Sequence, residues 1–224
     1  LLLLTHTMPC PLAALPASIA PVWEFLSHGG IFMIPLGLAS VAGTMAILYK
    51  WLSLSGRRVI PTRLAHDVAQ FQQRIVSDRV EPLLAEFEKG GSTLARLAAV
   101  VLRHRGKSRG EITQAVESAA RVETVHLHAG IGVLDTVITI APLLGLIGTA
   151  SGLITIFQGL GNNSDHLAIA RGIAEALTTT VVGLAIAVPC VIAHGYFLRR
   201  IEIQTATLES LLAGLSSACE KPNA

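Results

Sequence analysis

The chain has 224 residues, 51% hydrophobic and 14% charged, and its mean hydropathy of +0.59 is too high for a soluble domain of this length, so it predicts a membrane protein. Aromatic residues make up only 4%, and the apolar runs lack the alternation of barrel strands, which favours an all-α membrane protein over an outer-membrane barrel. The net charge of +2, without a dense basic patch, argues against a nucleic-acid-binding protein.

The N-terminal segment, residues 1–28, ends in PVWEFLSH, whose mixture of aromatic and polar residues is typical of a short helix in the membrane interface. Its first twenty residues contain no Lys or Arg, so a secretory signal would lack its basic start. Met8 is a candidate initiator.

Three apolar segments predict transmembrane helices. The first, residues 29–49, carries no charge over 21 positions. At about 1.5 Å per residue this length crosses a hydrocarbon core of about 30 Å. The second and third spans are predicted at residues 131–160 and 171–198, and the short loop 161–170 makes them a hairpin.

Between the first two spans, residues 50–130 predict a long, polar and helical insertion. From Glu111 onward apolar residues recur at three-to-four spacing, and nothing in the pattern breaks before the second span. We therefore expect one helix to run from about Glu111 straight into the membrane. Residues 199–224 show the same spacing and predict a C-terminal amphipathic helix.

The basic residues predict the orientation of the chain. Sixteen of the 17 Lys and Arg fall in residues 50–130 and 199–224, and only Arg171 is left for the other side. Because Lys and Arg near span ends favour the cytoplasm, these two regions are predicted to be cytoplasmic. The N-terminus and the loop 161–170 are then periplasmic.

Two motifs in the hairpin occur in the order and spacing of a known family: APLLGLIGTASGLITIF at residues 141–157 and GIAEALTTTVVGLAIAVP at residues 172–189. HGGIFMIPLGLAS before RRVIP is similar to the family's first span. Over nearly its whole length the chain resembles the ExbB/TolQ/MotA proton-channel family. Its three spans resemble the ExbB/TolQ branch, because MotA-type members have four.

The resemblance implies an inner-membrane stator subunit that uses the proton motive force to energise outer-membrane transport. It implies a homo-oligomer, a pentamer, around the single spans of an ExbD/TolR-like dimer, whose membrane aspartate carries the proton, together with a TonB/TolA-like protein. A TolQ-like role in envelope maintenance and a non-conducting scaffold remain open. No cofactor and no enzymatic activity are expected, since the sequence has no nucleophile elbow, phosphate loop or HExxH.

Polar residues within the hairpin predict an ion path. Counted from a midpoint near Asp165, Thr149 and Thr180 lie at equal depth, about 18 Å inside the loop ends. Glu175 lies about 10 Å inside, and carboxylates in membranes usually face a polar path or a partner. We therefore expect Thr149 and Thr180 to line the path and Glu175 to lie toward its outer mouth. The resemblance implies the same residues, as the family's second-span threonine and its third-span glutamate and threonine.

Simpler interpretations compete with this one. A threonine within a span often bonds to the carbonyl four residues earlier in its own helix. Glu175 is also spaced to pair with Arg171 at the interface. On a helical wheel Thr179 shares the face of Glu175 and belongs to the predicted path, whereas Thr180 is turned away, so we expect the two threonines to serve different surfaces.

The second span carries a face of small residues at Gly145, Gly148 and Gly152. Such residues allow helices in lipid to approach closely, so we expect this face to hold the oligomer together. Pro142 frees a backbone carbonyl and would loosen the same helix.

Asp135 and His194 lie at matching depth near the cytoplasmic boundary and predict an exit pair for protons, with an interfacial ion pair as the alternative. No metal site is expected. The three cysteines show no ligand spacing, and the cluster of Glu123, His126 and His128 is interpreted as a solvated helix face.

Overall fold

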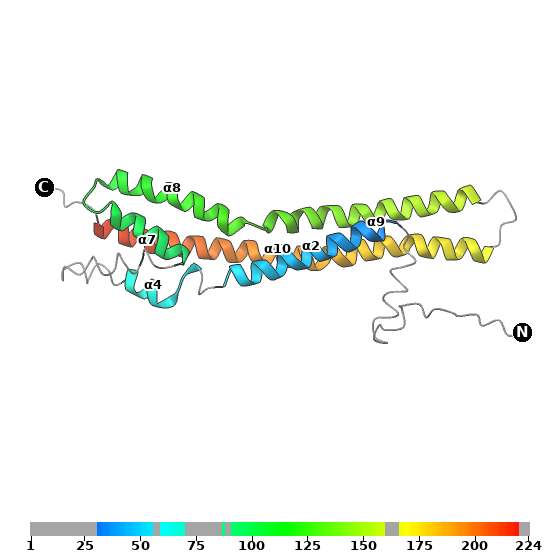
Figure 1. The fold of residues 1–224 in the computed structure, drawn as a ribbon, viewed down its shortest axis with the longest axis horizontal. Coiled ribbons are helices and arrows are strands. Elements are labelled where there is room, and N and C mark those ends of the chain that lie inside the picture. The colour runs from blue at the N-terminus through cyan, green and yellow to red at the C-terminus, as the bar shows by residue number, and fades with distance from the viewer. Residues whose placement is uncertain (1–30, 56–58, 70–86, 88–90, 160–165, 220–224) are drawn as a thin grey trace, which may run out of the picture. The chain divides into compact units, whose positions relative to one another are not determined.

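The computed structural model describes residues 31–55, 59–69, 87, 91–159 and 166–219 (Figure 1). Every regular element in these ranges is a helix, which confirms the all-α prediction. The interfacial helix predicted at residues 21–28 lies outside the described residues.

Three of the described helices are long and apolar enough to cross a membrane: α2 (Met33–Ser53), α9 (Ile131–Gly159) and α10 (His166–Cys219). The protein is therefore a membrane protein with three candidate spans. α9 remains helical through Pro142. α10 has 54 residues, so the third span and the C-terminal amphipathic helix form one continuous helix.

The polar insertion contains α4 (Thr62–Ala69), α7 (Thr93–Arg103) and α8 (Arg109–His128). α8 begins with a capping box, in which the Ser108 amide donates a 3.1 Å hydrogen bond to Glu111 and the Ser108 hydroxyl accepts one from the Glu111 amide. The Ser108 hydroxyl also donates a 2.9 Å hydrogen bond to the Glu111 carboxylate, and this bond, followed by the one from the Ser108 amide, lowers the pKa of the Glu111 carboxyl. α7 buries its apolar face and packs against α8.

The expectation of an unbroken helix into the membrane was wrong at Gly130. α8 ends at His128, and α9 begins at Ile131. Between them Gly130 has a φ of 84°, a conformation that glycine adopts without the steric cost of a Cβ. A Cβ there would also lie 3.3 Å from the ring of Tyr49. The turn thus depends on contacts from α2. The spacing of apolar residues in α8 and α9 gives no information about these contacts.

The chain divides into two compact units. One consists of Leu1–Val41 with Ile138–Val188, and the other of Ala42–Val137 with Pro189–Ala224. The first contains both hairpin motifs except for Pro189, the last residue of the second motif. The second contains the polar insertion and the ends of the three long helices.

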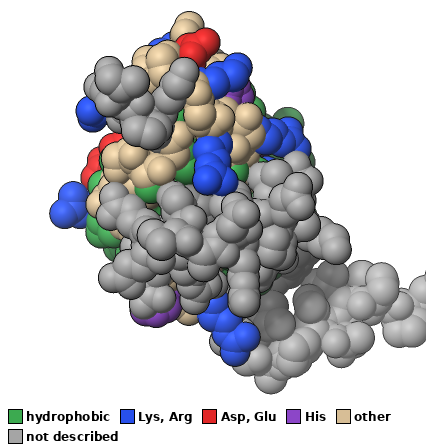
Figure 2. All heavy atoms as spheres, turned by 90° about the vertical axis from the view of Figure 1, so that its left-hand side faces the viewer, with side chains coloured by type: hydrophobic (Ala, Val, Ile, Leu, Met, Phe, Trp, Pro, Cys, Tyr) green, Lys and Arg blue, Asp and Glu red, His purple; other side chains and the backbone are tan. Residues whose placement is uncertain are grey.

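Basic residues are exposed where α7 ends and α8 begins. Figure 2 looks onto this part of the second unit, and blue Lys and Arg side chains stand out on it. Four of the exposed basic residues lie close together in sequence: Arg103, Arg105, Lys107 and Arg109. A surface of this charge suits water better than hydrocarbon.

Candidate ion-path site

Small residues let α9 and α10 approach closely within the first unit. A Cβ added to Gly145 would lie 2.9 Å from the Thr179 carbonyl oxygen, and one added to Gly183 would lie 2.6 Å from that of Ala141. Gly152 is similarly close to Ala176, at 2.7 Å. The backbones therefore meet where larger residues would not fit.

This contact bears on the role that we expected of the small-residue face. Gly145, Gly148 and Gly152 all pack against α10 of the same chain. The face therefore packs within the chain, and the expectation that it also joins subunits stays a prediction. Other apolar residues of α9 remain exposed for lipid or neighbouring subunits, among them Leu143, Leu146 and Ile147.

Three threonine hydroxyls gather in the contact between α9 and α10. The Thr149 hydroxyl is hydrogen-bonded to that of Thr180. It also lies 3.1 Å from the Gly145 carbonyl oxygen of its own helix and 3.2 Å from that of Ala176 across the contact. The Thr180 hydroxyl donates to the Gly145 carbonyl at 3.0 Å. Thr149 and Thr180, which lie equally far along the chain from the hairpin turn, are thus in direct contact.

As predicted, only Thr179 of the two threonines shares a surface with Glu175, but both Thr179 and Thr180 also reach α9. The Thr179 hydroxyl lies 3.2 Å from the Gly145 carbonyl oxygen, the same atom that Thr180 reaches, and 2.8 Å from that of Ala176. Only 2% of Thr179 is exposed. Because Gly145 has no side chain, α10 comes close enough for two successive residues to face α9. A helical wheel of α10 alone does not show this.

Glu175 lines a groove beside the threonine cluster. The groove has a volume of about 280 Å³, and its polar walls carry Glu175 and Thr179 from α10 and Ser151 and Thr155 from α9. Gly148 and Gly152 open it by presenting no side chain. Thr149 and Thr180 are absent from its lining and are partly buried in the helix contact. The structure therefore brings Glu175 and Thr179 to one surface and the other two threonines to the contact behind it.

The alternatives for these residues fare differently. Thr149 does bond to the carbonyl four residues earlier, but it also bonds across the contact, so packing within its own helix is only part of its role. Glu175 has no ion pair with Arg171 in the part of the chain that the structure describes. Its carboxylate remains available to the groove.

Two features of this site are not apparent from the sequence. One is the Gly145 carbonyl oxygen, which accepts from all three threonines. The other is Gly183, which brings α10 onto α9. Glycines spaced four residues apart predict close packing of two helices. They do not predict which backbone carbonyl the neighbouring helix reaches.

The remaining predicted residues lie in the second unit. Asp135 lies on α9 and His194 on α10, and their role as an exit pair stays a prediction. Glu123 is not freely solvated: Arg96 of α7 binds both carboxylate oxygens, at 2.6 and 2.5 Å. These hydrogen bonds lower the pKa of Glu123. No group of metal ligands occurs among the described residues.

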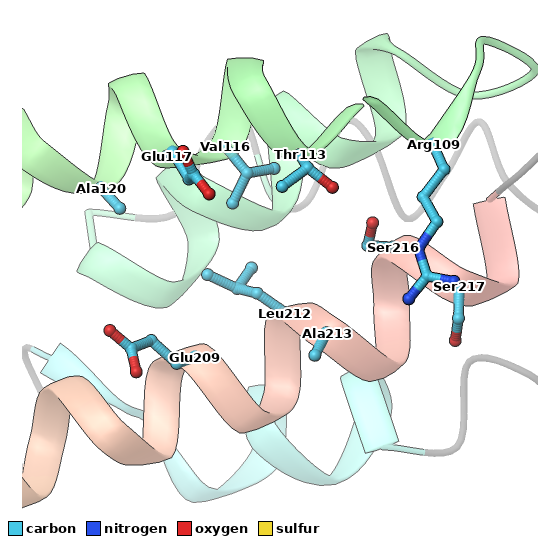
Figure 3. A pocket seen from close by; sticks show the side chains of 10 residues that line it. All are labelled: Arg109, Thr113, Val116, Glu117, Ala120, Glu209, Leu212, Ala213, Ser216 and Ser217. Atoms are coloured by element: carbon cyan, nitrogen blue, oxygen red, sulfur yellow. The ribbon is translucent and has the colours of Figure 1, made fainter. Parts of the chain in front are cut away.

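A second groove lies between α8 and the end of α10 (Figure 3). Its volume is about 330 Å³. Val116 and Leu212 point into it, Arg109 lies toward one end, and Glu117 and Glu209 lie toward the other. It shares no lining residue with the groove of Glu175. It therefore adds nothing to the predicted ion path.

Comparison with known proteins gives concordant matches. Residues 72–210 match the MotA/TolQ/ExbB proton channel family. A protein of Methanothermobacter thermautotrophicus named as a biopolymer transport ExbB homolog is 35% identical over 56% of this chain and 45% of its own length. A Synechocystis protein named as ExbB-like is 32% identical over 83% and 76%. A Tol-Pal system protein TolQ of Pseudomonas aeruginosa is 37% identical over 41% of each chain. The chain thus spans less than half of the first and last of these relatives.

Proposed function

The chain belongs to the MotA/TolQ/ExbB proton channel family, and from that premise we propose that it is an ExbB-like subunit of an inner-membrane motor that uses the proton motive force to energise outer-membrane transport. Envelope maintenance, as the TolQ relative suggests, is the second candidate. The resemblance covers both branches, so the partner that the subunit serves decides between them.

The groove of Glu175 is the observation that carries the proposal. A carboxylate is costly in hydrocarbon unless it faces a polar path or a partner. Glu175 shares its groove with the hydroxyls of Thr179, Ser151 and Thr155, which can both donate and accept hydrogen bonds. A passive scaffold would gain nothing from such a polar surface on a spanning hairpin.

The proton carrier is proposed to lie on a partner. Threonine does not titrate near neutral pH, so Thr149, Thr179 and Thr180 orient hydrogen bonds rather than carry a proton. We propose a pentamer that surrounds the single spans of an ExbD/TolR-like dimer, whose aspartate exchanges the proton beside Glu175. A TonB- or TolA-like protein then receives the mechanical work.

The proposed orientation has the N-terminus and the loop 161–170 in the periplasm. The polar insertion and the end of α10 lie in the cytoplasm. Lys50, Arg199 and Arg200, at the ends of the first and third spans, support this orientation, because basic residues near spans are retained on the cytoplasmic side.

Proton flux in liposomes tests the proposal. The protein is reconstituted alone, with an ExbD-like protein, and with a TolR-like protein, and internal pH is followed after a potential is applied. We expect flux only with the cognate single-span partner. Absence of flux with both partners, in assemblies of normal size, would favour the non-conducting scaffold.

A further inference from the structure

One lysine of α2 is completely buried against the end of another helix. Lys50 lies in the last turn of α2, and 0% of its surface is exposed. Its Nζ donates a 2.6 Å hydrogen bond to the carbonyl oxygen of Leu127. Lysine is almost never fully buried without a partner, and the Leu127 carbonyl oxygen is the partner here. The question is why this carbonyl oxygen needs a donor from another helix.

The reason lies in the turn that ends α8. The last carbonyl groups of a helix have no partner within it. In an unbroken helix the amide of Ile131 would donate to Leu127, four residues earlier. Here the chain turns at Gly130, and the helix ends with a tighter hydrogen bond, from the amide of Ala129 to the carbonyl oxygen of His126 three residues earlier, at 3.2 Å. The Lys50 amino group supplies a donor to a carbonyl at this turn, where the negative end of the helix dipole favours a cation.

The residue before Lys50 contacts the same turn. A Cβ on Gly130 would lie 3.3 Å from the Tyr49 ring and 3.8 Å from the Lys50 side-chain carbon Cε. Two successive residues of α2 therefore hold the turn, one through its amino group and one through its ring. Neither is part of the proposed ion path.

A similar cap joins α10 to α2. The side-chain amide of Gln204 donates a 3.3 Å hydrogen bond to the carbonyl oxygen of Leu54, directly after the end of α2. In the second unit α10 thus caps α2, and α2 caps α8. Side chains link the three helices through their C-terminal carbonyl groups.

We propose that Lys50 is a positioning residue that caps the C-terminus of α8 and fixes the turn at Gly130, through which the polar insertion joins the second span. The first span and this turn then move as one body. The role is independent of whether the protein conducts protons.

Amide hydrogen exchange of the full chain in lipid nanodiscs tests the proposal. Lys50→Met keeps the length and apolar stem of the side chain and removes its donors. We expect the amides of residues 126–131 to exchange about fivefold faster, as the loss of one hydrogen bond of ordinary strength predicts. Lys50→Arg keeps a donor and should restore slow exchange. Lys107→Met, which removes an exposed lysine, is the matched control and should leave these amides unchanged.

A double mutant separates capping from general packing. In Gly130→Ala the left-handed φ becomes costly, so α8 and α9 tend to join and the Ile131 amide can serve Leu127. Lys50→Met should then add little further exchange. The proposal is overturned if Lys50→Met leaves exchange unchanged, if Lys50→Arg behaves like Lys50→Met, or if Lys50→Met acts equally in both backgrounds. Should Lys50→Met not accumulate in the membrane, Lys50→Gln, which shortens the donor, is judged by the same criteria.

Discussion

The hydroxyls of Thr149 and Thr180 are hydrogen-bonded to each other between α9 and α10, and both lie within bonding distance of the Gly145 carbonyl oxygen. Each hydroxyl has one proton, and rotation of the hydroxyl can direct this proton to one of several nearby acceptors. This arrangement joins the two spans and leaves the bonding pattern adjustable.

Thr149→Val and Thr180→Val should each weaken the hairpin by about 0.6 kcal/mol, the average found for hydrogen bonds between membrane helices. The double mutant should cost less than the sum, because no unpaired hydroxyl is left behind. Unfolding in mixed detergent micelles measures both effects. Thr178→Val is the matched control, since Thr178 bonds only to Ala174 of its own helix.

The same double mutant tests the proposed ion path. If the threonine cluster shapes the path, proton-coupled work should fall while subunit assembly stays normal. Full activity at normal expression would show that the two hydroxyls serve packing alone.

Gly148→Leu should destabilise the hairpin within each subunit. Even a Cβ at this position would lie 2.7 Å from the Thr179 hydroxyl oxygen, so a leucine must push α10 away. Overpacking of this kind typically costs about 1–3 kcal/mol. Gly132→Ala lies on the same helix with open space around its Cβ and serves as the control. A Gly148→Leu protein as stable as the control would contradict the close contact.

The spans followed from the sequence because length and lack of charge decide what can cross a membrane, whatever the neighbours. The turn at Gly130 did not, because the apolar pattern continues past it and the contacts that select it come from Tyr49 and Lys50. The positions of Thr179 and Thr180 also depend on another helix. Local patterns identify helices and polar residues within them, whereas which faces meet depends on close approach at particular glycines.

The Arg96–Glu123 pair should make the packing of α7 on α8 sensitive to acid. Its hydrogen bonds hold the pKa of Glu123 below the unfolded value of about 4.3. The pair therefore stabilises the fold above that pH, and its contribution is lost as pH falls through the lower pKa of the folded state. Glu123→Gln should remove this part of the acid dependence. Hydrogen exchange of α7, followed between about pH 6 and pH 3 on either side of the unfolded pKa, measures the effect. Glu117→Gln, an exposed change on α8, is the control, and an unaltered acid profile in Glu123→Gln would refute the assignment.

Cysteine labelling of intact cells tests the proposed orientation. In a background without native cysteines, Lys107→Cys should be protected from a membrane-impermeant maleimide, because the exposed basic surface around it is proposed to be cytoplasmic. A cysteine at Asn162, in the loop between the last two spans, should be labelled from outside. The reverse pattern would invert the topology.

Glu175 provides the most direct test of the groove. Glu175→Gln keeps the shape and hydrogen-bonding capacity of the side chain but removes its charge, whereas Glu175→Ala removes both. If the groove attracts protons or binds a charged partner, both changes should lower proton flux with the single-span partner at least about tenfold, equivalent to about 1.4 kcal/mol. If only hydrogen bonding matters, Glu175→Gln should retain most of the flux and Glu175→Ala should not.

The control is Glu202→Gln, which removes the charge of an exposed carboxylate farther along α10. Since Glu175 has no ion pair with Arg171 within the described residues, loss of a structural salt bridge does not account for a defect. Wild-type flux from Glu175→Ala in fully assembled complexes would remove Glu175 from the path.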